Sequence, residues 1–157
     1  MLEQSVAPFR VRNRAQAAPS LTVKSVERVK SRSVLTYGRF DGFKTSHARM
    51  LAELSSLGTE LIVGCATDAF CAQIGQTPET PFEARRAILE SCRYVSRVIA
   101  LDSWDQQRTD IVNYNISVLA MRTDLHAQVG ELDDIVQIVH LPSDAPHGMI
   151  KNIGETA

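Results

Sequence analysis

Several features that would assign this chain to a specialised class of protein are missing from its sequence. Its 157 residues include only three cysteines, Cys65, Cys71 and Cys92, and no two of them form a CxxC pair. An odd, unpatterned set of cysteines is typical of free thiols in a reducing compartment. No apolar run approaches the roughly 18 to 20 residues that a membrane-spanning helix needs, and no apolar segment marks a secretory signal. We therefore expect a cytoplasmic protein without a transmembrane segment.

The chain also lacks an overall excess of charge. Lys plus Arg number 17 and Asp plus Glu number 18, so the net charge is −1 at pH 7. This balance predicts no general attraction to nucleic acid or to anionic lipid. Hydrophobic residues make up 44% of the chain and charged residues 22%, which is an ordinary globular composition with enough apolar residues for a core.

The charge is nevertheless unevenly distributed along the chain. Residues 1–33 contain seven basic and two acidic residues, whereas residues 34–157 have a net charge of −6. We therefore predict a basic N-terminal extension, 1–33, followed by one domain, 34–157. Within the extension Ser20 is a suitable N-cap for a short helix. Three interpretations of the extension stay open: a disordered tail, a helix that docks on a protein partner or a second copy, and, weakest, a surface for membrane or nucleic acid.

From Val34 onward, short apolar runs alternate with helical segments. The strand-like runs are 34–37, 61–66, 98–101, 118–121 and 135–141, and the helical segments are 46–57, 82–94 and 104–115. This alternation is typical of βαβ units. We therefore predict an α/β fold, a five-stranded parallel sheet with helices on both faces. Ligands bind such sheets beyond the carboxyl ends of the strands, so the loops that follow the strands are where chemistry is expected.

The loop after the first strand carries the strongest candidate site. Residues 38–47 read Gly-Arg-Phe-Asp-Gly-Phe-Lys-Thr-Ser-His and lead directly into a helix. A turn between a strand and a helix N-terminus suits a phosphate, because free backbone N–H groups and the helix dipole face the anion. Arg39, Lys44 and His47 add positive charge or donors at the same point. The alternative is that Thr45 or Ser46 only caps the helix and that the cations are solvated.

An ordered set of motifs resembles one family. The segments that carry the resemblance are Leu35–His47, Ala66–Phe70, Phe82–Leu89, Arg93–Val95, Trp104–Gln107 and Asn115–Val118. Together they resemble the small nucleotidyltransferases of the cytidylyltransferase type, most of all the bacterial glycerol-3-phosphate cytidylyltransferases. No single motif is decisive, but the set follows the family's order over about 34–155.

This resemblance implies a Rossmann-like fold, a homodimer and a reaction. A substrate phosphate attacks the α-phosphorus of CTP and releases pyrophosphate, with Mg²⁺ accompanying the nucleotide and no intrinsic cofactor. The protein positions two anions and stabilises charge that develops on the phosphates. The implied partners are CTP or another nucleotide and a small alcohol phosphate such as glycerol 3-phosphate. No metal-binding residue is expected, since Asp124 with His126 is too sparse for a zinc site.

The resemblance also assigns candidate roles residue by residue. His47 matches the second histidine of the family's His-x-Gly-His motif and Lys44 stands at the first, so these two are the catalytic candidates. Arg85 matches the arginine of the family's Glu-x-x-Arg helix, with Arg86 as the alternative after a one-residue shift. Asp124 matches an aspartate of the base-recognition segment. The nucleotide- and phosphate-binding candidates are Tyr37, Gly38, Arg39, Phe40, Asp41, Arg85 and Asp124.

Structural roles are the alternatives for several of these and for other marked residues. Arg85, Arg86 and Arg93 lie near one helical face, where salt bridges are as good an explanation as phosphate contacts. Thr67 and Asp68 are suited to cap the structure that follows the second strand. Trp104 is expected to pack at a helix N-terminus.

Several family positions are occupied by different residues in this chain. Lys44 replaces the first histidine, Ser46 the glycine between the histidines, and Arg122 a glycine of the base-recognition segment. Residues 73–81 contain no Lys or Arg where the family has a lysine, and the arginine and hydroxyl donors of the C-terminal signature are absent, with Asp144 among their replacements. Losing one preorganised donor typically costs about 10²–10³ in rate. Two hypotheses stay open: an active nucleotidyltransferase, and a degenerate homologue that acts by binding nucleotide or phosphate or by dimerising.

Overall fold

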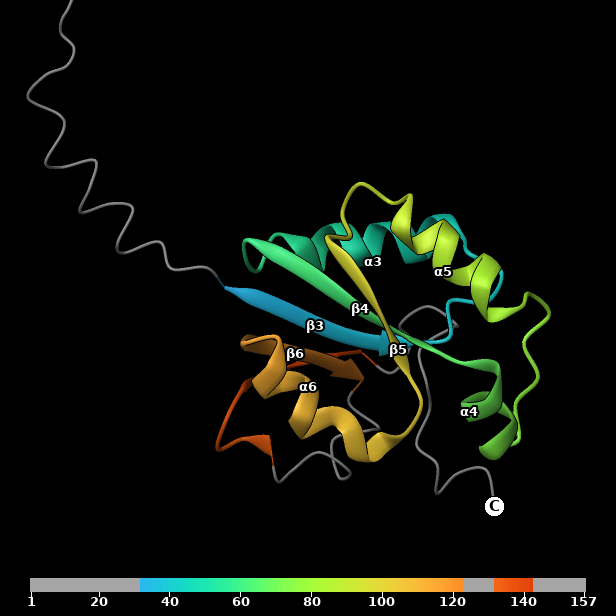
Figure 1. Ribbon diagram of the computed structural model, residues 1–157. Coiled ribbons are helices and arrows are strands. Elements are labelled where there is room, and N and C mark those ends of the chain that lie inside the picture. The colour runs from blue at the N-terminus through green and yellow to red at the C-terminus, as the bar shows by residue number, and fades with distance from the viewer. Residues whose placement is uncertain (1–31, 123–131, 143–157) are drawn as a thin grey trace, which may run out of the picture. The chain divides into compact units, whose positions relative to one another are not determined.

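The computed structural model describes residues 32–122 and 132–142 (Figure 1). They belong to the second of the two units into which the chain divides, Arg32–Ala157. The basic extension with its short helix, and the residues Asp124, His126 and Asp144, lie outside the described residues, so the predictions made for them stay predictions. None of the helices in the described part of the chain has the length and apolar character of a membrane span.

A five-stranded parallel sheet forms the centre of the domain. Its strands are β3 (Ser33–Gly38), β4 (Glu60–Ala66), β5 (Arg97–Leu101), β6 (Ile116–Arg122) and β7 (Gln137–Leu141). They lie in the order β5-β4-β3-β6-β7, and every neighbouring pair is parallel. The chain builds one half of the sheet outward from β3 and then returns to place β6 on its other side. The topological switch point therefore lies between β3 and β6, where ligands bind in folds of this kind.

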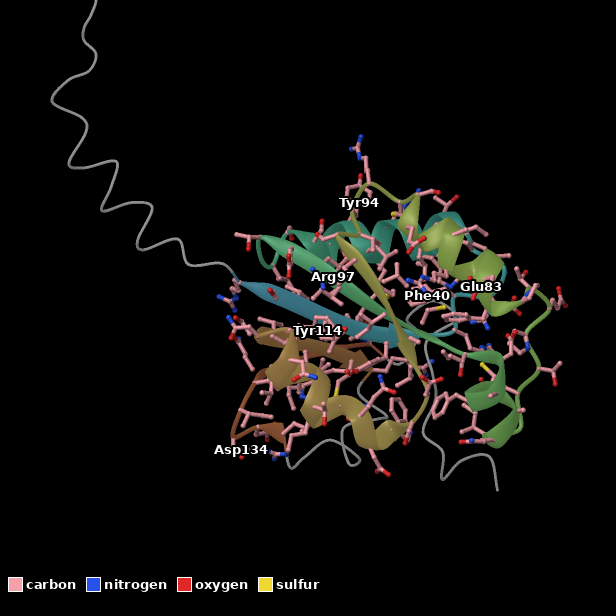
Figure 2. The ribbon with its side chains drawn as sticks, in the orientation of Figure 1. Phe40, Glu83, Tyr94, Arg97, Tyr114 and Asp134 are labelled. Carbon is pink, nitrogen blue, oxygen red and sulfur yellow. The ribbon has the colours of Figure 1, made fainter. Side chains whose placement is uncertain are left out.

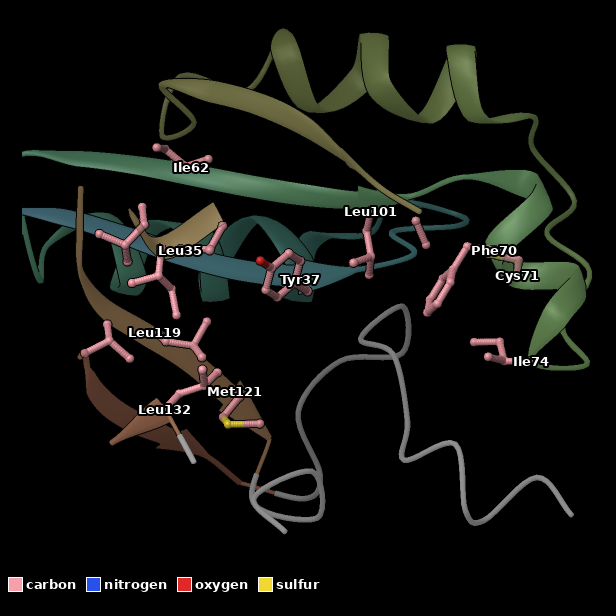
Figure 3. Packing of buried hydrophobic residues seen from close by; sticks show 14 residues of the cluster. Leu35, Tyr37, Ile62, Phe70, Cys71, Ile74, Leu101, Leu119, Met121 and Leu132 are labelled. Atoms are coloured by element: carbon pink, nitrogen blue, oxygen red, sulfur yellow. The ribbon is translucent and has the colours of Figure 1, made fainter. Parts of the chain in front are cut away.

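Helices cover both faces of this sheet, as predicted. The helices α3 (Thr45–Ser55) and α5 (Phe82–Glu90) pack on one face, and a 3-10 turn, η1 (Trp104–Gln106), followed by α6 (Gln107–Asn113) packs on the other (Figure 1). A core lies in each interface. Met50 and Leu51 of α3 meet Val63 of β4 on the first face. On the second face Leu35, Ile62 and Leu119 belong to a cluster that extends to Phe70 (Figure 3).

Two helices depart from the sequence prediction. The helix expected over 82–94 ends at Glu90, because the Ser96 N–H donates to the Leu61 carbonyl at 2.8 Å and draws the chain into the sheet. The six-residue helix α4 (Asp68–Gln73) was not predicted, since one and a half turns are too short to show a helical period. It begins where the Thr67 hydroxyl accepts the Phe70 N–H at 3.1 Å, which is the capping role expected of Thr67.

Candidate functional site

The loop after β3 enters α3 through two left-handed residues. Phe40 has φ +54° and Gly42 has φ +62°. Gly42 adopts this conformation freely, whereas a side-chain-bearing residue there costs about 1–2 kcal/mol. The buried Phe40 ring, between the sheet and the layer of α3 and α5 (Figure 2), offsets that cost by packing 5.8 Å from the His47 ring. The sharp turn therefore directs the chain into the start of α3.

The N-terminus of α3 is open toward an anion. Its N-cap is Lys44, whose own N–H is bound by the His47 side chain, and its first turn contains no acidic residue. The first helical hydrogen bond runs from the Ala48 N–H to the Lys44 carbonyl at 3.2 Å. The N–H groups of Thr45 and Ser46 thus have no partner within the helix, and the helix dipole makes this end electropositive. The exposed Lys44 side chain adds a full charge at the same place.

His47 is held in one orientation behind this N-terminus. Its side chain is buried, its ring stacks on Phe43 at 5.5 Å, and its Nδ1 accepts the Lys44 backbone N–H at 3.0 Å. Because Nδ1 is an acceptor, the neutral imidazole carries its proton on Nε2. These contacts fix the orientation of the His47 ring, and its predicted catalytic role stays a prediction.

The N-terminus of α5 is closed to anions by carboxylates from two other loops. The carboxylate of Asp41 accepts the N–H groups of Glu79 at 2.8 Å and Thr80 at 3.0 Å. Asp68 accepts the N–H of Phe82, the first helical residue, at 3.1 Å. A neighbouring cavity of about 330 Å³ is lined by Asp68 and Glu79 and by no cation. Negative charge therefore surrounds the N-terminus of α5, whereas the first turn of α3 carries no acidic residue.

The backbone N–H groups account for the acidity of both carboxylates. Burial alone would raise the pKa of Asp41, but the N–H groups of Glu79 and Thr80 outweigh it and lower that pKa below its usual value. The Phe82 N–H, and then Arg85, lower the pKa of Asp68. Both carboxylates are therefore ionised at neutral pH and act as negatively charged caps.

The guanidinium of Arg85 is buried and engaged with the protein. Its Nε donates to the Thr80 carbonyl at 2.7 Å, its Nη1 to the carbonyls of Arg39 at 2.9 Å and Ala66 at 2.8 Å, and its Nη2 to Asp68 at 2.7 Å. These bonds use four of the five N–H donors that a guanidinium carries. The neighbouring Arg86 instead makes a solvent-exposed ion pair with Glu90. Arg85 thus ties together three loops, and its predicted contact with phosphate stays a prediction.

Two unpartnered donors lie in the loops beyond the carboxyl ends of β3 and β5. In the described part of the chain, the buried side-chain atoms without a hydrogen-bond partner are Arg39 Nε, Trp104 Nε1 and Gln76 Oε1. A buried donor without an acceptor costs about 1–3 kcal/mol. An anionic acceptor at Arg39 would recover that cost, and the phosphate-binding role predicted for Arg39 stays a prediction. Arg122, at the end of β6, is also buried beside the switch point.

Tyr37, another predicted nucleotide-binding residue, has its side chain in the core of the opposite face (Figure 3). Its hydroxyl donates to Asp110 at 2.8 Å, and its ring packs edge-on against Trp104 at 6.3 Å. Burial, and then the charge of Asp110, raise the pKa of Tyr37 far above its usual value. Trp104 is the first residue of η1, which agrees with its expected packing at a helix N-terminus.

The structure thus brings together most of the predicted site in one loop and the adjoining helix start. Gly38 ends β3, Arg39, Phe40 and Asp41 form the turn, and Lys44 and His47 begin α3. Sequence reasoning missed Asp68 and Thr80 as partners of these residues. The sequence contains no signal for these contacts, because they join segments that are distant along the chain.

Comparison with known proteins shows the family to which the chain belongs. A family model described as cytidylyltransferase-like matches residues 35–147. The chain belongs to the cytidylyltransferase-like family. The glycerol-3-phosphate cytidylyltransferase of Bacillus subtilis (strain 168) is 36% identical over 111 residues, which cover 71% of this chain and 86% of the relative. The corresponding protein of Staphylococcus aureus (strain NCTC 8325 / PS 47) is 31% identical over 108 residues, 69% of this chain and 82% of the relative.

Other members of the cytidylyltransferase-like family have a different substrate in their names. The ethanolamine-phosphate cytidylyltransferase of Arabidopsis thaliana is 30% identical over 121 residues, which cover 76% of this chain and 28% of that longer relative.

Among solved structures, the lipopolysaccharide core biosynthesis protein from Thermoplasma volcanium GSS1 is similar with a TM-score of 0.61 and 24% identity. It covers 71% of this chain and 96% of that protein, and it supports the Rossmann-like fold.

Proposed function

We propose that this protein transfers a cytidylyl group from CTP to an alcohol phosphate such as glycerol 3-phosphate and releases pyrophosphate. The observation that carries the proposal is the open N-terminus of α3, where Lys44 and the oriented His47 adjoin the loop after β3. This site lies at the carboxyl end of the central strand, in a chain that is 36% identical to a glycerol-3-phosphate cytidylyltransferase.

The geometry supports a mechanism that depends on position and charge. An oxygen of the acceptor phosphate attacks the α-phosphorus, the bond from that phosphorus to the β-phosphate oxygen breaks, and pyrophosphate takes the electron pair. The attacking oxygen is already ionised at neutral pH, so no general base is needed. The N–H groups of Thr45 and Ser46 and the Lys44 ammonium would stabilise the charge that accumulates on the transferring phosphate, and His47 would keep its proposed catalytic role beside them.

Mg²⁺ is part of this proposal only as a companion of the nucleotide. No group of three or more His, Cys, Asp or Glu side chains in the described ranges could hold a metal ion. Magnesium commonly binds through substrate phosphates and one or two carboxylates. Asp41 and Asp68 already accept backbone N–H groups. The triphosphate would therefore supply most of the ligands.

A second candidate function is nucleotide or phosphate binding without turnover. It is favoured by the engagement of Arg85 with the protein and by the carboxylates that cap α5. The first feature engages a cation that a transition state would use, and the second places negative charge at a helix N-terminus. We also infer a homodimer and a cytoplasmic location, which light scattering of the purified protein and cell fractionation would test.

One experiment separates the two functions. Pyrophosphate release is measured at high protein concentration with CTP, Mg²⁺ and glycerol 3-phosphate, and CTP binding is measured by calorimetry. The variants are Lys44→Met, at an exposed position, and His47→Asn, which keeps an acceptor for the Lys44 N–H, with circular dichroism as the folding control. We expect each folded variant to lose about 10²–10³ in the rate of release.

The other outcomes are equally informative. In one of them the wild type binds CTP without releasing pyrophosphate, and Lys44→Met weakens that binding. This pair of results would establish binding without turnover for this substrate pair. Neither binding nor release in the folded wild type would refute the proposed function.

A further inference from the structure

A closed ring of hydrogen bonds lies behind the start of α3. It consists of Arg39, Asp41, Thr80 and Arg85, and we call it the loop ring. Asp41 accepts the Thr80 N–H at 3.0 Å, Arg85 Nε donates to the Thr80 carbonyl at 2.7 Å, and Arg85 Nη1 donates to the Arg39 carbonyl at 2.9 Å. The backbone between Arg39 and Asp41 closes the ring.

Thr80 is held on both sides of its backbone by this arrangement. Its N–H and hydroxyl bind Asp41, and its carbonyl binds Arg85. The adjacent Glu79 N–H also donates to Asp41, so both carboxylate oxygens are used. Hydrogen bonds to charged groups are about twice as strong as neutral ones. The segment before α5 and the loop after β3 are therefore fixed against each other.

The loop ring encloses the strained part of the loop that leads to the candidate site. Phe40, with φ +54°, lies between the two ring members Arg39 and Asp41. The Arg85 Nη1 bond fixes the carbonyl of the peptide that precedes Phe40. Lys44 lies three residues after Asp41, and His47 lies six residues after Asp41. Only a short segment therefore separates the loop ring from the start of α3. A shift of the turn would therefore move the α3 N–H groups, Lys44 and His47 together.

The charge of Asp41 argues that its role is to position the loop. An unpaired carboxylate beside a triphosphate site would repel the nucleotide. Here three donors from Glu79 and Thr80 face its oxygens, and their contacts favour the ionised form. The carboxylate therefore faces residues 79–80, which lie outside the loop that carries Lys44 and His47.

We propose that Asp41 and Arg85 are positioning residues for phosphate binding, which act through the loop ring on Lys44 and His47 and do not themselves touch the phosphate. This inference rests on the proposed function, because it requires that the α3 N-terminus receive a phosphate. It differs from the sequence-based assignment, which places Asp41 and Arg85 among the ligand contacts.

The test uses the full chain with Asp41→Ala and Asp41→Asn. Asp133→Asn is the matched control, because Asp133 is exposed in the turn before β7 and lies outside the loop ring. Amide hydrogen exchange is followed at Glu79 and Thr80, which face Asp41, and at Lys44 and Ala48, whose N–H groups bond to the Nδ1 of His47 and to Lys44. CTP dissociation constants, KM and kcat are measured well below the unfolding midpoint.

We expect Asp41→Ala to speed exchange about tenfold or more at all four amides and to weaken CTP binding by a similar factor. Asp41→Asn, which keeps one acceptor oxygen, is expected to fall between Asp41→Ala and the wild type, and Asp133→Asn to match the wild type. Faster exchange at Glu79 and Thr80 alone, with unchanged exchange at Lys44 and Ala48 and unchanged CTP binding, would overturn the proposal. So would weaker CTP binding without any change in exchange, since Asp41 would then be a direct contact.

Failure of the proposed function would give a different result. If the wild type neither binds CTP nor releases pyrophosphate, the proposed function fails and the positioning role for phosphate fails with it. The exchange data would then still report whether the loop ring couples residues 79–80 to the start of α3.

Discussion

Replacing Arg85 by methionine tests whether this side chain supports the fold, because methionine keeps most of the volume and removes every donor. The carbonyls of Thr80, Arg39 and Ala66 would each lose a buried partner. One unsatisfied buried acceptor costs about 1–3 kcal/mol, and neighbouring losses are not additive. The lost ion pair with Asp68 adds little to this cost, because the Asp68 side chain is 54% exposed. We expect Arg85→Met to lower the free energy of unfolding by about 3–5 kcal/mol, or roughly 10–20 °C in Tm.

The neighbouring arginine provides the control for this prediction. Arg86 forms an exposed ion pair with Glu90 one helical turn away, at 3.1 Å. Arg86→Met is therefore expected to change the free energy of unfolding by less than about 0.5 kcal/mol. Arg85→Lys should recover only part of the loss, because a compact ammonium cannot reach acceptors in three loops at once.

Chemical denaturation and thermal unfolding of the variants measure these differences, and CTP binding is measured beside them. The reasoning would be refuted if Arg85→Met were as stable as Arg86→Met and lost only CTP affinity. That result would mean that Arg85 contacts phosphate and that its bonds to the loops contribute no net stability.

Three further predictions follow from other contacts. Tyr37→Phe removes the hydroxyl that donates to buried Asp110 at 2.8 Å and should cost about 1–3 kcal/mol by chemical denaturation; an unchanged midpoint would contradict it. Gly64→Ala would place a Cβ 2.3 Å from Tyr37 Cδ1, so it should lower Tm through a cost of about 1–3 kcal/mol or more, and normal stability would show that the ring shifts freely. Because the pKa of Asp41 is lowered by folding, its stabilisation is present above its unfolded pKa of about 3.9 and is lost as pH falls through the lower folded value. Asp41→Asn should therefore flatten the acid side of the stability curve below about pH 4, and parallel wild-type and variant curves would oppose this.

The sheet and its covering helices were predictable because its strands are short, mostly apolar runs separated by helical segments. The central strands β3, β4 and β6 are buried on both faces, so a strand such as β4 contains almost no polar residue and is easily recognised. The helix boundaries were less predictable. The end of α5 depends on Ser96 binding to Leu61 across 35 residues, and α4 depends on a single capping hydroxyl.

The candidate loop after β3 was predictable for a similar local reason. Gly38 to His47 are contiguous in the chain, and a strand followed by a turn and a helix start is a local arrangement that exposes N–H groups. The candidate roles of Lys44 and His47 could therefore be read from one short segment.

The partners of the charged side chains were decided only by the tertiary structure. Strand alternation places Tyr37 on the same face as Leu35, but only the packing of α6 brings Asp110 to its hydroxyl. Arg85 and Arg86 are adjacent and chemically identical, yet one is buried among carbonyls from three loops and the other pairs in solvent. A hydrogen bond depends on atoms within about 3 Å, and in these bonds the atoms come from segments up to 73 residues apart in the sequence. The sequence alone therefore determined the layers of the fold and the position of the candidate loop, whereas the assembled loops decided that Arg85 is held by carbonyl groups of the protein and that Arg86 forms an exposed ion pair.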